Sequence, residues 1–314
     1  MHTMLFLSLF SFFSRSQESG IEQIKDFGSN PGNLEMFQYV PENFKKNAPL
    51  VIVLHGCTQS ADTIALESGW NKLADANKFM VVYPQQKLVN NIKKCFNWFN
   101  PSDIKRESGE TASIKQMIDF AIDKHKIDRK RVFITGLSAG GAMAMAMLAN
   151  YPETFSAGAI MSGIPFGPNS SITAGINAMK GNVTYSGKEW ADFILDINKD
   201  YKGSYPKIVL FQGEDDPYVN FENADEIIKQ YTYLHQIENS PIIFENFDKN
   251  KDVSLYKYGN NKGLVLYYKI KNMGHALAID PGINEKQGGA IATYAVDKNF
   301  HSTYWAANFF NIAN

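Results

Sequence analysis

The sequence has little cysteine, little net charge and no long apolar run beyond its first residues. Two cysteines among 314 residues exclude a disulfide-dense scaffold and a four-cysteine zinc site. The 31 Lys and Arg residues nearly balance the 32 Asp and Glu residues. The chain as a whole therefore lacks the excess positive charge that would attract nucleic acid or an anionic membrane. No segment reaches the ~20 apolar residues of a spanning helix. We therefore expect no nucleic-acid partner and no membrane span, and the sequence predicts no oligomeric state.

The one apolar run stands at the N-terminus. Residues Leu5–Phe13 read LFLSLFSFF, which is the length of the hydrophobic region of a signal peptide. Ser14 and Ser16 are small residues near a possible cleavage point, although the preceding MHTM carries little positive charge. We expect residues 1–16 to be a signal peptide and the mature protein to be secreted or periplasmic.

Strand-like and helix-like patterns alternate through the rest of the chain. The expected strands are Pro49–Leu54, Phe79–Tyr83 (ended by Pro84), Arg131–Thr135, Gly158–Ser162, Ile208–Phe211 and Leu264–Ile270. The expected helices follow Ser108, follow Gly140 as far as about Asn150, and span Phe221–Leu234. This alternation predicts an α/β fold with a mostly parallel sheet covered by helices on both faces. We expect one domain over residues 17–314, with a lid or pocket wall inserted at about 165–205.

A candidate nucleophile lies where an expected strand meets an expected helix. Gly136-Leu137-Ser138-Ala139-Gly140 matches G-x-S-x-G, a pattern that alone is weakly specific. Here a β-rich run ends just before it and an Ala-rich helix begins just after it. Such a turn holds the serine Oγ above the sheet and requires glycine at its flanks. We predict that Ser138 is a catalytic nucleophile.

A serine nucleophile needs backbone N–H groups that stabilise the oxyanion of the tetrahedral intermediate. One should be the amide of Ala139, at the N-terminus of the helix after Ser138, where the helix dipole favours an anion. The other should come from the loop after an earlier strand. His55-Gly56-Cys57 directly follows PLVIVL, so Cys57 is the second candidate donor. We interpret the His55 side chain itself as structural.

The general base should be a histidine that follows both Ser138 and an acid along the chain. The histidines far enough downstream are His235, His275 and His301. We expect His235 on the surface at a helix end and His301 on a helix face, whereas His275 occupies a turn after an expected strand. The acid should follow the preceding strand, in KIVLFQGEDDPYV. Asp216 is the predicted acid and Asp215 the alternative; the acid would orient the imidazole and stabilise the imidazolium.

Longer runs of the chain resemble one enzyme family. They are HGCTQSADTIALESGWNKLADANKFMVVYPQQ, CFNWF, GETASI, IDRKRVFITGLSAGGAM, YPETFSAGAIMSG and MGHA. Together they resemble the poly(3-hydroxybutyrate) depolymerase-type esterase family, which also contains feruloyl and acetylxylan esterases. The match runs from about Pro49 to Phe310. The resemblance implies an α/β-hydrolase with no cofactor, and we expect no metal.

The resemblance also helps to choose between the two candidates for the catalytic acid. The family's G-x-x-D-x-x-V motif falls on Gly213, Asp216 and Val219, which favours Asp216 over Asp215. Family members often have histidine before that glycine, whereas this chain has Gln212. We expect this departure from the family pattern to affect the packing of the loop more than catalysis.

The resemblance also bears on the two cysteines. In an exported protein Cys57 and Cys95 should pair, and the resemblance implies the same disulfide. The bridge would close a span of 38 residues, worth ~4 kcal/mol in the chain-entropy model. It would also fix the loop that presents the Cys57 amide.

We expect an esterase that acts on an ester substrate, either a short-chain polyester or its oligomers. The alternatives are a feruloyl, acetylxylan or general carboxylesterase, and a binding protein on an inactive hydrolase fold, against which the complete set of Ser138, Asp216 and His275 argues. Aromatic pocket walls predict acyl chains of about two to six carbons and faster cleavage of soluble oligomers than of crystalline polymer. The expected wall residues are Phe166, Tyr185, Trp190 and Phe193, facing Phe96–Phe99.

Overall fold

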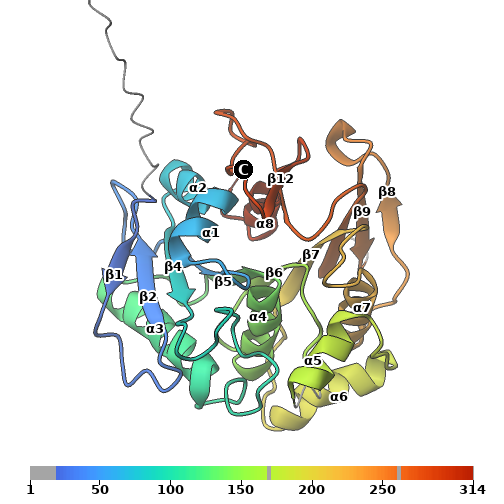
Figure 1. Cartoon of the computed structure of the whole chain (residues 1–314), viewed down its shortest axis with the longest axis horizontal. Helices are drawn as coiled ribbons and strands as arrows, with labels where there is room; N and C mark the ends of the chain where they lie inside the picture. The colour runs from blue at the N-terminus through green and yellow to red at the C-terminus, as the bar shows by residue number, and fades with distance from the viewer. Residues whose placement is uncertain (1–18, 168–170, 260–262, 314) are drawn as a thin grey trace, which may run out of the picture.

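A ten-stranded sheet forms the centre of the protein in the computed structural model, which describes residues 19–167, 171–259 and 263–313 (Figure 1). The expected signal peptide at residues 1–16 lies outside the described residues. The strands follow the order β1-β2-β4-β3-β5-β6-β7-β10-β9-β8. Their bounds are β1 Glu22–Ile24, β2 Glu35–Tyr39, β3 Leu50–Leu54, β4 Met80–Gln85, β5 Val132–Leu137, β6 Ala157–Met161, β7 Lys207–Gly213, β8 Ile242–Phe244, β9 Val253–Tyr258 and β10 Val265–Ile270.

Parallel pairing joins the six strands β4, β3, β5, β6, β7 and β10. These are the six strands that the sequence predicted, each displaced by no more than two residues at an end. The predicted α/β-hydrolase fold is therefore confirmed. At the two edges, β1, β2, β8 and β9 pair antiparallel, and none of these four strands was predicted from the sequence.

The predicted end of one strand, β4, was wrong. β4 does not end before Pro84 but continues to Gln85, and Pro84 lies opposite Met36 of the antiparallel neighbour β2. On its other side β4 pairs with β3 only from Met80 to Val82. Pro84 therefore lies where β4 has one strand neighbour, and a residue without an N–H is tolerated there.

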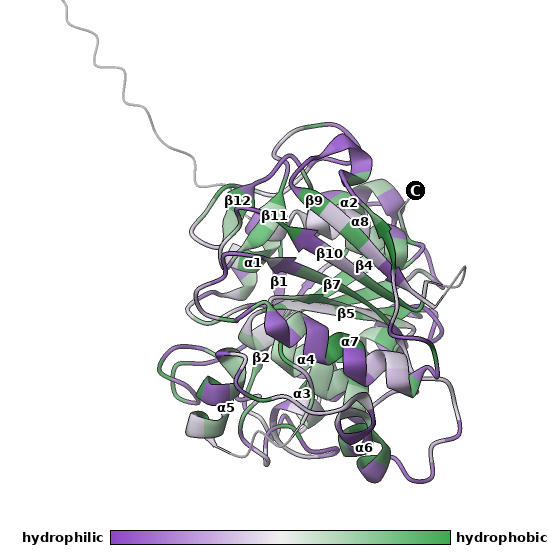
Figure 2. Cartoon of the chain, turned by 90° about the vertical axis from the view of Figure 1, so that its right-hand side faces the viewer, coloured by the Kyte–Doolittle hydropathy of each residue, from purple (hydrophilic) through white to green (hydrophobic). Residues whose placement is uncertain are grey.

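Helices cover both faces of the sheet (Figure 2). In β3, Leu50, Ile52 and Leu54 pack into one apolar core, whereas Val51 and Val53 pack into the other. The first core is covered by α3 (Gly109–His125), α4 (Ala139–Asn150), α6 (Gly187–Ile197) and α7 (Glu222–Leu234), and the second by α1 (Ala61–Ser68), α2 (Trp70–Asn77) and α8 (Ser302–Phe309). Burial on both faces explains the unbroken apolar runs of the central strands.

Smaller elements complete the fold. Helix α5 (Ile172–Met179) belongs to the 165–205 insertion, and β11 (Leu277–Ile279) pairs parallel with β12 (Ala295–Asp297). A short 3-10 helix, η1, spans Phe247–Lys249. Among the helices of the described ranges, none has the length and apolar character needed to cross a membrane.

Candidate active site

Ser138 lies at a strained turn between β5 and α4. Its backbone has φ 58° and ψ −121°, a conformation that side chains with a Cβ rarely adopt. Its amide donates to the Met161 carbonyl oxygen of β6 at 2.9 Å. A Cβ at Gly136 would lie 2.3 Å from the carbonyl carbon of Gly140, and a Cβ at Gly140 would lie 2.3 Å from the Leu54 carbonyl oxygen. Both positions therefore require glycine, because β3, β5 and α4 approach closely here.

Asp216 and His275 meet beyond the ends of two adjacent parallel strands, β7 and β10. His275 Nδ1 lies 2.7 Å from Asp216 Oδ2, and the Asp216 side chain is fully buried. The amides of Tyr218 and Val219 both donate to Asp216 Oδ1 at 2.9 Å. Burial alone would raise the pKa of Asp216, but the bond to His275 and the two amides outweigh it and lower the pKa. Asp216 is thus ionised at neutral pH.

The loops that carry Asp216 and His275 are held against each other by their backbones. The Asp215 amide donates to the Met273 carbonyl oxygen at 3.0 Å. A Cβ on Gly213 would lie 2.2 Å from that same oxygen, so the two loops are in direct contact. Asp215, the alternative acid, is exposed, and it is Asp216 that reaches the imidazole.

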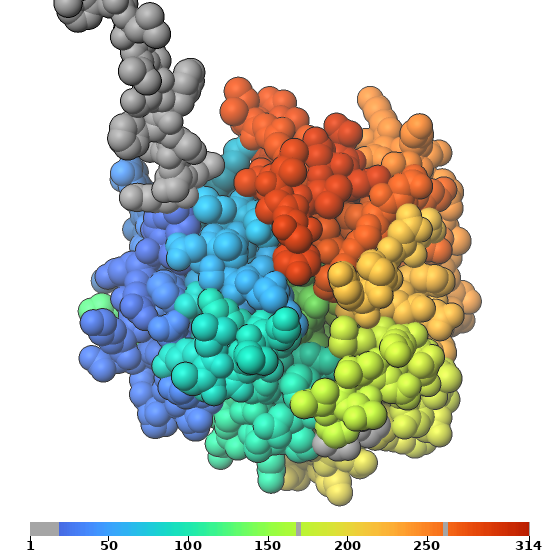
Figure 3. Space-filling model, viewed as in Figure 1, coloured from blue at the N-terminus to red at the C-terminus, as the bar shows by residue number. Residues whose placement is uncertain are grey.

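Ser138 and His275 line one cavity of about 240 Å³. It opens on the face shown in Figure 3, where green residues lie in a hollow between cyan, red and yellow segments. The lining residues are Gly56, Cys57, Gln59, Leu137, Ser138, Met179, Tyr218, His275 and Tyr294. In the part of the chain that the structure describes, no group of three or more His, Cys, Asp or Glu side chains could hold a metal ion. The cavity can hold a small acyl group beside a hydroxyl and an imidazole.

The two candidate oxyanion donors lie at this cavity or at its edge. Ala139 is the first residue of α4, so its amide has no acceptor within the helix and lies at the positive end of the dipole. Cys57 lines the cavity from the loop after β3. In this loop Gly56 N donates to Gln59 Oε1 at 2.7 Å, and Thr58 N donates to a backbone carbonyl at 2.6 Å. These two bonds fix the backbone on both sides of the Cys57 amide.

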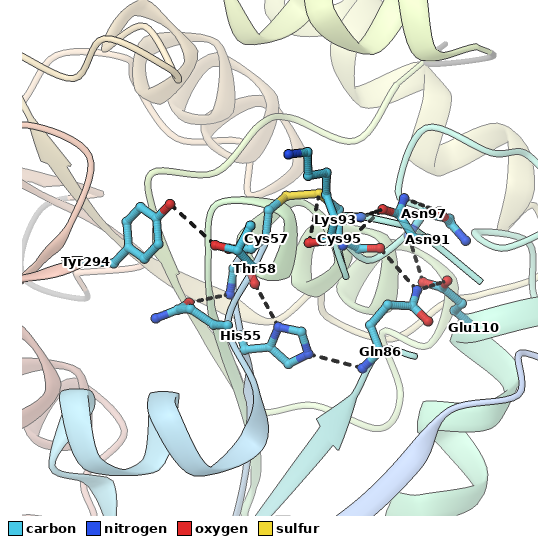
Figure 4. The surroundings of a disulfide bond; sticks show 12 residues. His55, Cys57, Thr58, Gln86, Asn91, Lys93, Cys95, Asn97, Glu110 and Tyr294 are labelled. Carbon is cyan, nitrogen blue, oxygen red and sulfur yellow. Dashed lines mark hydrogen bonds between the residues drawn. A yellow bond between two sulfur atoms is a disulfide. The ribbon is translucent and has the colours of Figure 1, made fainter. Parts of the chain in front are cut away.

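A disulfide joins Cys57 to Cys95, as the resemblance implied (Figure 4). Beside it, the fully buried His55 donates from Nδ1 to the next carbonyl oxygen at 2.7 Å and accepts from Gln86 N through Nε2 at 3.1 Å. The Gln86 side chain in turn donates to the Cys95 carbonyl oxygen and to Glu110. Burial lowers the pKa of His55 to about 4 and raises the pKa of Glu110 to about 8. His55 has the structural role predicted for it.

The aromatic residues of the insertion do not line the cavity, which corrects the sequence-based expectation. None of the four candidate side chains is among the residues that line it. Trp190 of α6 is 1% exposed and donates from Nε1 to Glu226 Oε2 of α7 at 2.5 Å. The rings of Tyr185 and Phe193 lie 4.9 and 5.8 Å from the Trp190 ring. These rings pack on α7 because Glu226 satisfies the buried indole N–H there.

Among the described residues of the insertion, Met179 of helix α5 lines the cavity. Trp98 is 6% exposed, and its ring packs against Gly175 of α5. The aromatic run at 96–99 therefore supports α5 and does not form an open wall opposite it.

The two rejected histidines lie away from the cavity, and neither has the position expected from the sequence. His235 caps α7, is partly buried, and lies with Nε2 3.2 Å from the Pro206 carbonyl oxygen. His301 precedes α8, is 1% exposed, and lies with Nε2 2.8 Å from the Ser68 carbonyl oxygen. The surface position expected for His235 was wrong, and His301 precedes α8 instead of lying on a helix face. Each imidazole contacts a carbonyl oxygen that the fold buries.

Sequence reasoning missed several residues around the site. Tyr218 and Tyr294 lie edge-on to the His275 ring, with centroids 5.4 and 6.3 Å away. Gln212 donates from Nε2 to Asp216 Oδ2 at 3.1 Å, so interpreting it as a matter of loop packing was incomplete. Two signals were available, namely its place four residues before Asp216 at a strand end and the departure from the family's usual histidine, and neither reveals a contact.

The chain matches the family model described as esterase PHB depolymerase over residues 35–241. Among curated proteins, it is 41% identical over 299 residues to poly(3-hydroxyalkanoate) depolymerase C of Paucimonas lemoignei, covering 95% of this chain and 72% of that protein. It is 30% identical over 233 residues to feruloyl esterase B of Thermothelomyces thermophilus, covering 70% of this chain and 77% of that protein.

A solved structure shares the architecture. The acetyl xylan esterase from Aspergillus awamori superposes with a TM-score of 0.75 at 26% identity, covering 81% of this chain and 93% of that one. The solved relative and the two curated ones are all named as enzymes that hydrolyse carboxylic esters, although the substrates in their names differ.

Proposed function

This chain belongs to the esterase PHB depolymerase family and is a carboxylic ester hydrolase, and we propose that it cleaves poly(3-hydroxybutyrate) or its oligomers. One observation carries the proposal: Ser138 and His275 share a cavity, with Asp216 bonded to the far side of the imidazole. The name of the depolymerase relative supports the choice of substrate. A binding protein on an inactive fold is no longer an alternative.

In the proposed acylation step, Ser138 Oγ attacks the ester carbonyl carbon and its proton passes to His275 Nε2. The carbonyl oxygen becomes an oxyanion, which accepts hydrogen bonds from the amides of Cys57 and Ala139. Asp216 holds the proton of Nδ1 in place, so that Nε2 is the free acceptor. The carbon–oxygen bond to the leaving group then breaks, and His275 gives its proton to the departing alcohol.

In the proposed deacylation step, water replaces the alcohol. His275 Nε2 takes one water proton while the oxygen attacks the acyl carbon, and the same two amides stabilise the second oxyanion. The bond to Ser138 Oγ breaks, and Oγ regains a proton from His275. The products are the acid and the free enzyme, so one water is consumed for each ester bond.

The cavity favours short acyl groups. Its volume of about 240 Å³ lies below the usual ~300–1,000 Å³ range of small-molecule pockets. Its apolar lining comes from Leu137, Met179, Tyr218 and Tyr294, which suits a hydroxybutyryl unit. We therefore keep the expectation of two to six acyl carbons, now because of the cavity's size and not because of the aromatic insertion.

An exposed apolar stripe supports a polymeric substrate. Ile172, Ile176 and Met179 occupy positions i, i+4 and i+7 of α5, and therefore one face of it. Ile172 is 64% and Ile176 is 48% exposed, whereas Met179 lines the catalytic cavity. Ile92, 85% exposed, lines a neighbouring hollow together with Ile172. Exposed apolar side chains that continue from a cavity favour a substrate extending beyond it.

A second candidate is an esterase of feruloyl or acetyl groups. It is favoured by the two tyrosines beside His275, since Tyr218 is 60% exposed and its ring could stack on an aromatic acyl group. The names of the feruloyl and acetyl xylan esterase relatives agree with this alternative.

We further propose that the enzyme works outside the reducing cytoplasm. The Cys57–Cys95 disulfide supports this, because such bridges persist in oxidising compartments. N-terminal sequencing of protein recovered from the medium or periplasm should show removal of about 16 residues, and an intact Met1 would contradict it.

The substrate proposal is tested by comparing kcat/KM across hydroxybutyrate oligomers, p-nitrophenyl esters of increasing acyl length, methyl ferulate and acetylated xylan. The proposal predicts a maximum at short acyl chains and efficient cleavage of the oligomers. A strong preference for methyl ferulate or acetylated xylan would instead favour the second candidate, and a maximum at twelve carbons or more would indicate a lipase.

A further inference from the structure

The Asp216 carboxylate accepts hydrogen bonds from two backbone amides and from His275, and also from one further side chain, that of Gln212. Gln212, the sixth residue of β7, is 2% exposed and donates from Nε2 to Asp216 Oδ2 at 3.1 Å. The same Nε2 donates to the Val219 carbonyl oxygen at 3.0 Å and lies 3.4 Å from the Gly213 carbonyl oxygen. All of these partners can only accept, so the amide NH₂ must face them.

The four donors divide between the two carboxylate oxygens. Two backbone amides bind Oδ1, whereas Gln212 and His275 converge on Oδ2. A carboxylate held by the Oδ1 bonds alone could still rotate its other oxygen away from the imidazole. The Gln212 side chain opposes that rotation and at the same time ties the loop to the strand through Val219.

We infer that Gln212 is a positioning residue that fixes Asp216 Oδ2 toward His275 and so sets the tautomer and direction of the imidazole. This inference rests on the proposed function of the triad. It goes beyond that function by assigning a role in catalysis to a neutral side chain that touches neither the cavity nor the substrate.

Few other charges face this contact. Besides Asp216 and His275, the neighbouring strands carry Lys269, which lies opposite Gln212 in β10, and Glu214, whose carboxylate pairs with Lys269 at 3.1 Å. Helix α7, which packs on these strands, adds Asp225, whose carboxylate is also close enough to Lys269 to feel its charge. The Lys269 and Glu214 side chains are about one-third exposed. A change at residue 212 therefore acts mainly on the Asp216–His275 pair.

The first test replaces the donor with a side chain of similar volume. Gln212→Met should lower kcat roughly tenfold or more with little change in KM, because small misplacements of a catalytic group are costly. The matched control is Gln230→Met on α7. Gln230 is fully buried and donates to the carbonyl oxygens of Phe166 and Trp190 at 2.6 and 2.8 Å, far from Asp216 in the hydrogen-bond network. The Gln230→Met variant should lose about as much stability as Gln212→Met but keep the wild-type kcat.

The second test uses pH. In Gln212→Glu, the introduced carboxyl faces Asp216, and two carboxylates so close cannot both ionise easily. While the pair holds a proton, the introduced group can still donate to Asp216, and activity should be partly rescued. As pH rises and that proton is lost, kcat/KM should fall on the alkaline side, whereas Gln212→Met should be impaired at every pH.

The outcomes separate the inference from the function on which it rests. An inactive Asp216→Asn variant, combined with a Gln212→Met variant whose kcat stays within roughly twofold of that of Gln230→Met, would overturn the inference alone. Identical pH profiles for Gln212→Met and Gln212→Glu would also overturn it. A fully active Asp216→Asn variant would overturn the proposed function and the inference together.

Discussion

Replacing both Cys57 and Cys95 by alanine removes the covalent link between two loops beside the candidate active site. Both cysteines are only partly buried, so alanine loses little packing. The hydrogen bond from Thr58 N to the Lys93 carbonyl oxygen, 2.6 Å long, remains the nearest connection between the loops. The change therefore acts mainly on the freedom of the unfolded chain and on the mobility of the loop that carries the Cys57 amide.

The bridge spans 38 residues. In the chain-entropy model, opening a loop of that length lowers the free energy of unfolding by about 4 kcal/mol. For a chain of 314 residues the entropy of unfolding is roughly 0.6 kcal/mol per kelvin, so Tm should fall by roughly 6 °C. The kcat should fall as well, by no more than the ~10²–10³-fold that follows loss of a whole oxyanion donor.

Calorimetry and urea unfolding measure the first effect, and steady-state hydrolysis of p-nitrophenyl butyrate measures the second. Wild-type protein treated with a reductant is the control, since it should behave like the double variant, which itself should not respond to reductant. A double variant with wild-type Tm would refute the stability argument. One with wild-type kcat would refute the claim that the bridge positions the Cys57 amide.

Three further predictions concern the catalytic acid, the pH dependence of stability and the exposed apolar stripe on α5. Asp216→Asn should lower kcat by about 10⁴, while Asp215→Asn should leave it almost unchanged; the reverse kinetics would make Asp215 the acid. Since the folded-state pKa of Glu110 is about 8 against an ordinary 4.5, the folded state binds more protons between these values. The free energy of unfolding should therefore fall as pH rises through that window, by up to about 1.4 kcal/mol per pH unit, and Glu110→Gln should flatten the urea-derived slope. The double variant Ile172→Ser, Ile176→Ser should slow hydrolysis of poly(3-hydroxybutyrate) granules roughly tenfold without affecting p-nitrophenyl butyrate; equal slowing of both would contradict a polymer-binding stripe.

Local patterns predicted those parts of the molecule that are determined locally. The run Leu50–Leu54 is buried at every residue, as expected of a short strand that is covered on both faces. The glycines around Ser138 predicted a tight turn, and the structure contains one with positive φ at the serine. The order of Ser138, Asp216 and His275 along the chain predicted side chains that the fold brings to one place.

Contacts between distant segments were not predictable in this way. Trp190 looks like a pocket wall until Glu226, 36 residues away, is seen to accept its indole N–H. Gln212 looks like a packing residue until the turn after β7 brings Asp216 back to it. The edge strand Glu22–Ile24 has no apolar periodicity, because it is largely exposed and only its pairing with β2 makes it a strand.

The central claim is that Ser138 is the nucleophile of an ester hydrolase. The most direct measurement is mass spectrometry of the protein after reaction with a fluorophosphonate probe, which labels activated serines covalently. The account predicts one modified peptide, carrying the probe on Ser138, and stoichiometric loss of esterase activity, with no labelling and no activity in a folded Ser138→Ala variant. Labelling at another residue, or hydrolysis by Ser138→Ala at the wild-type rate, would contradict it.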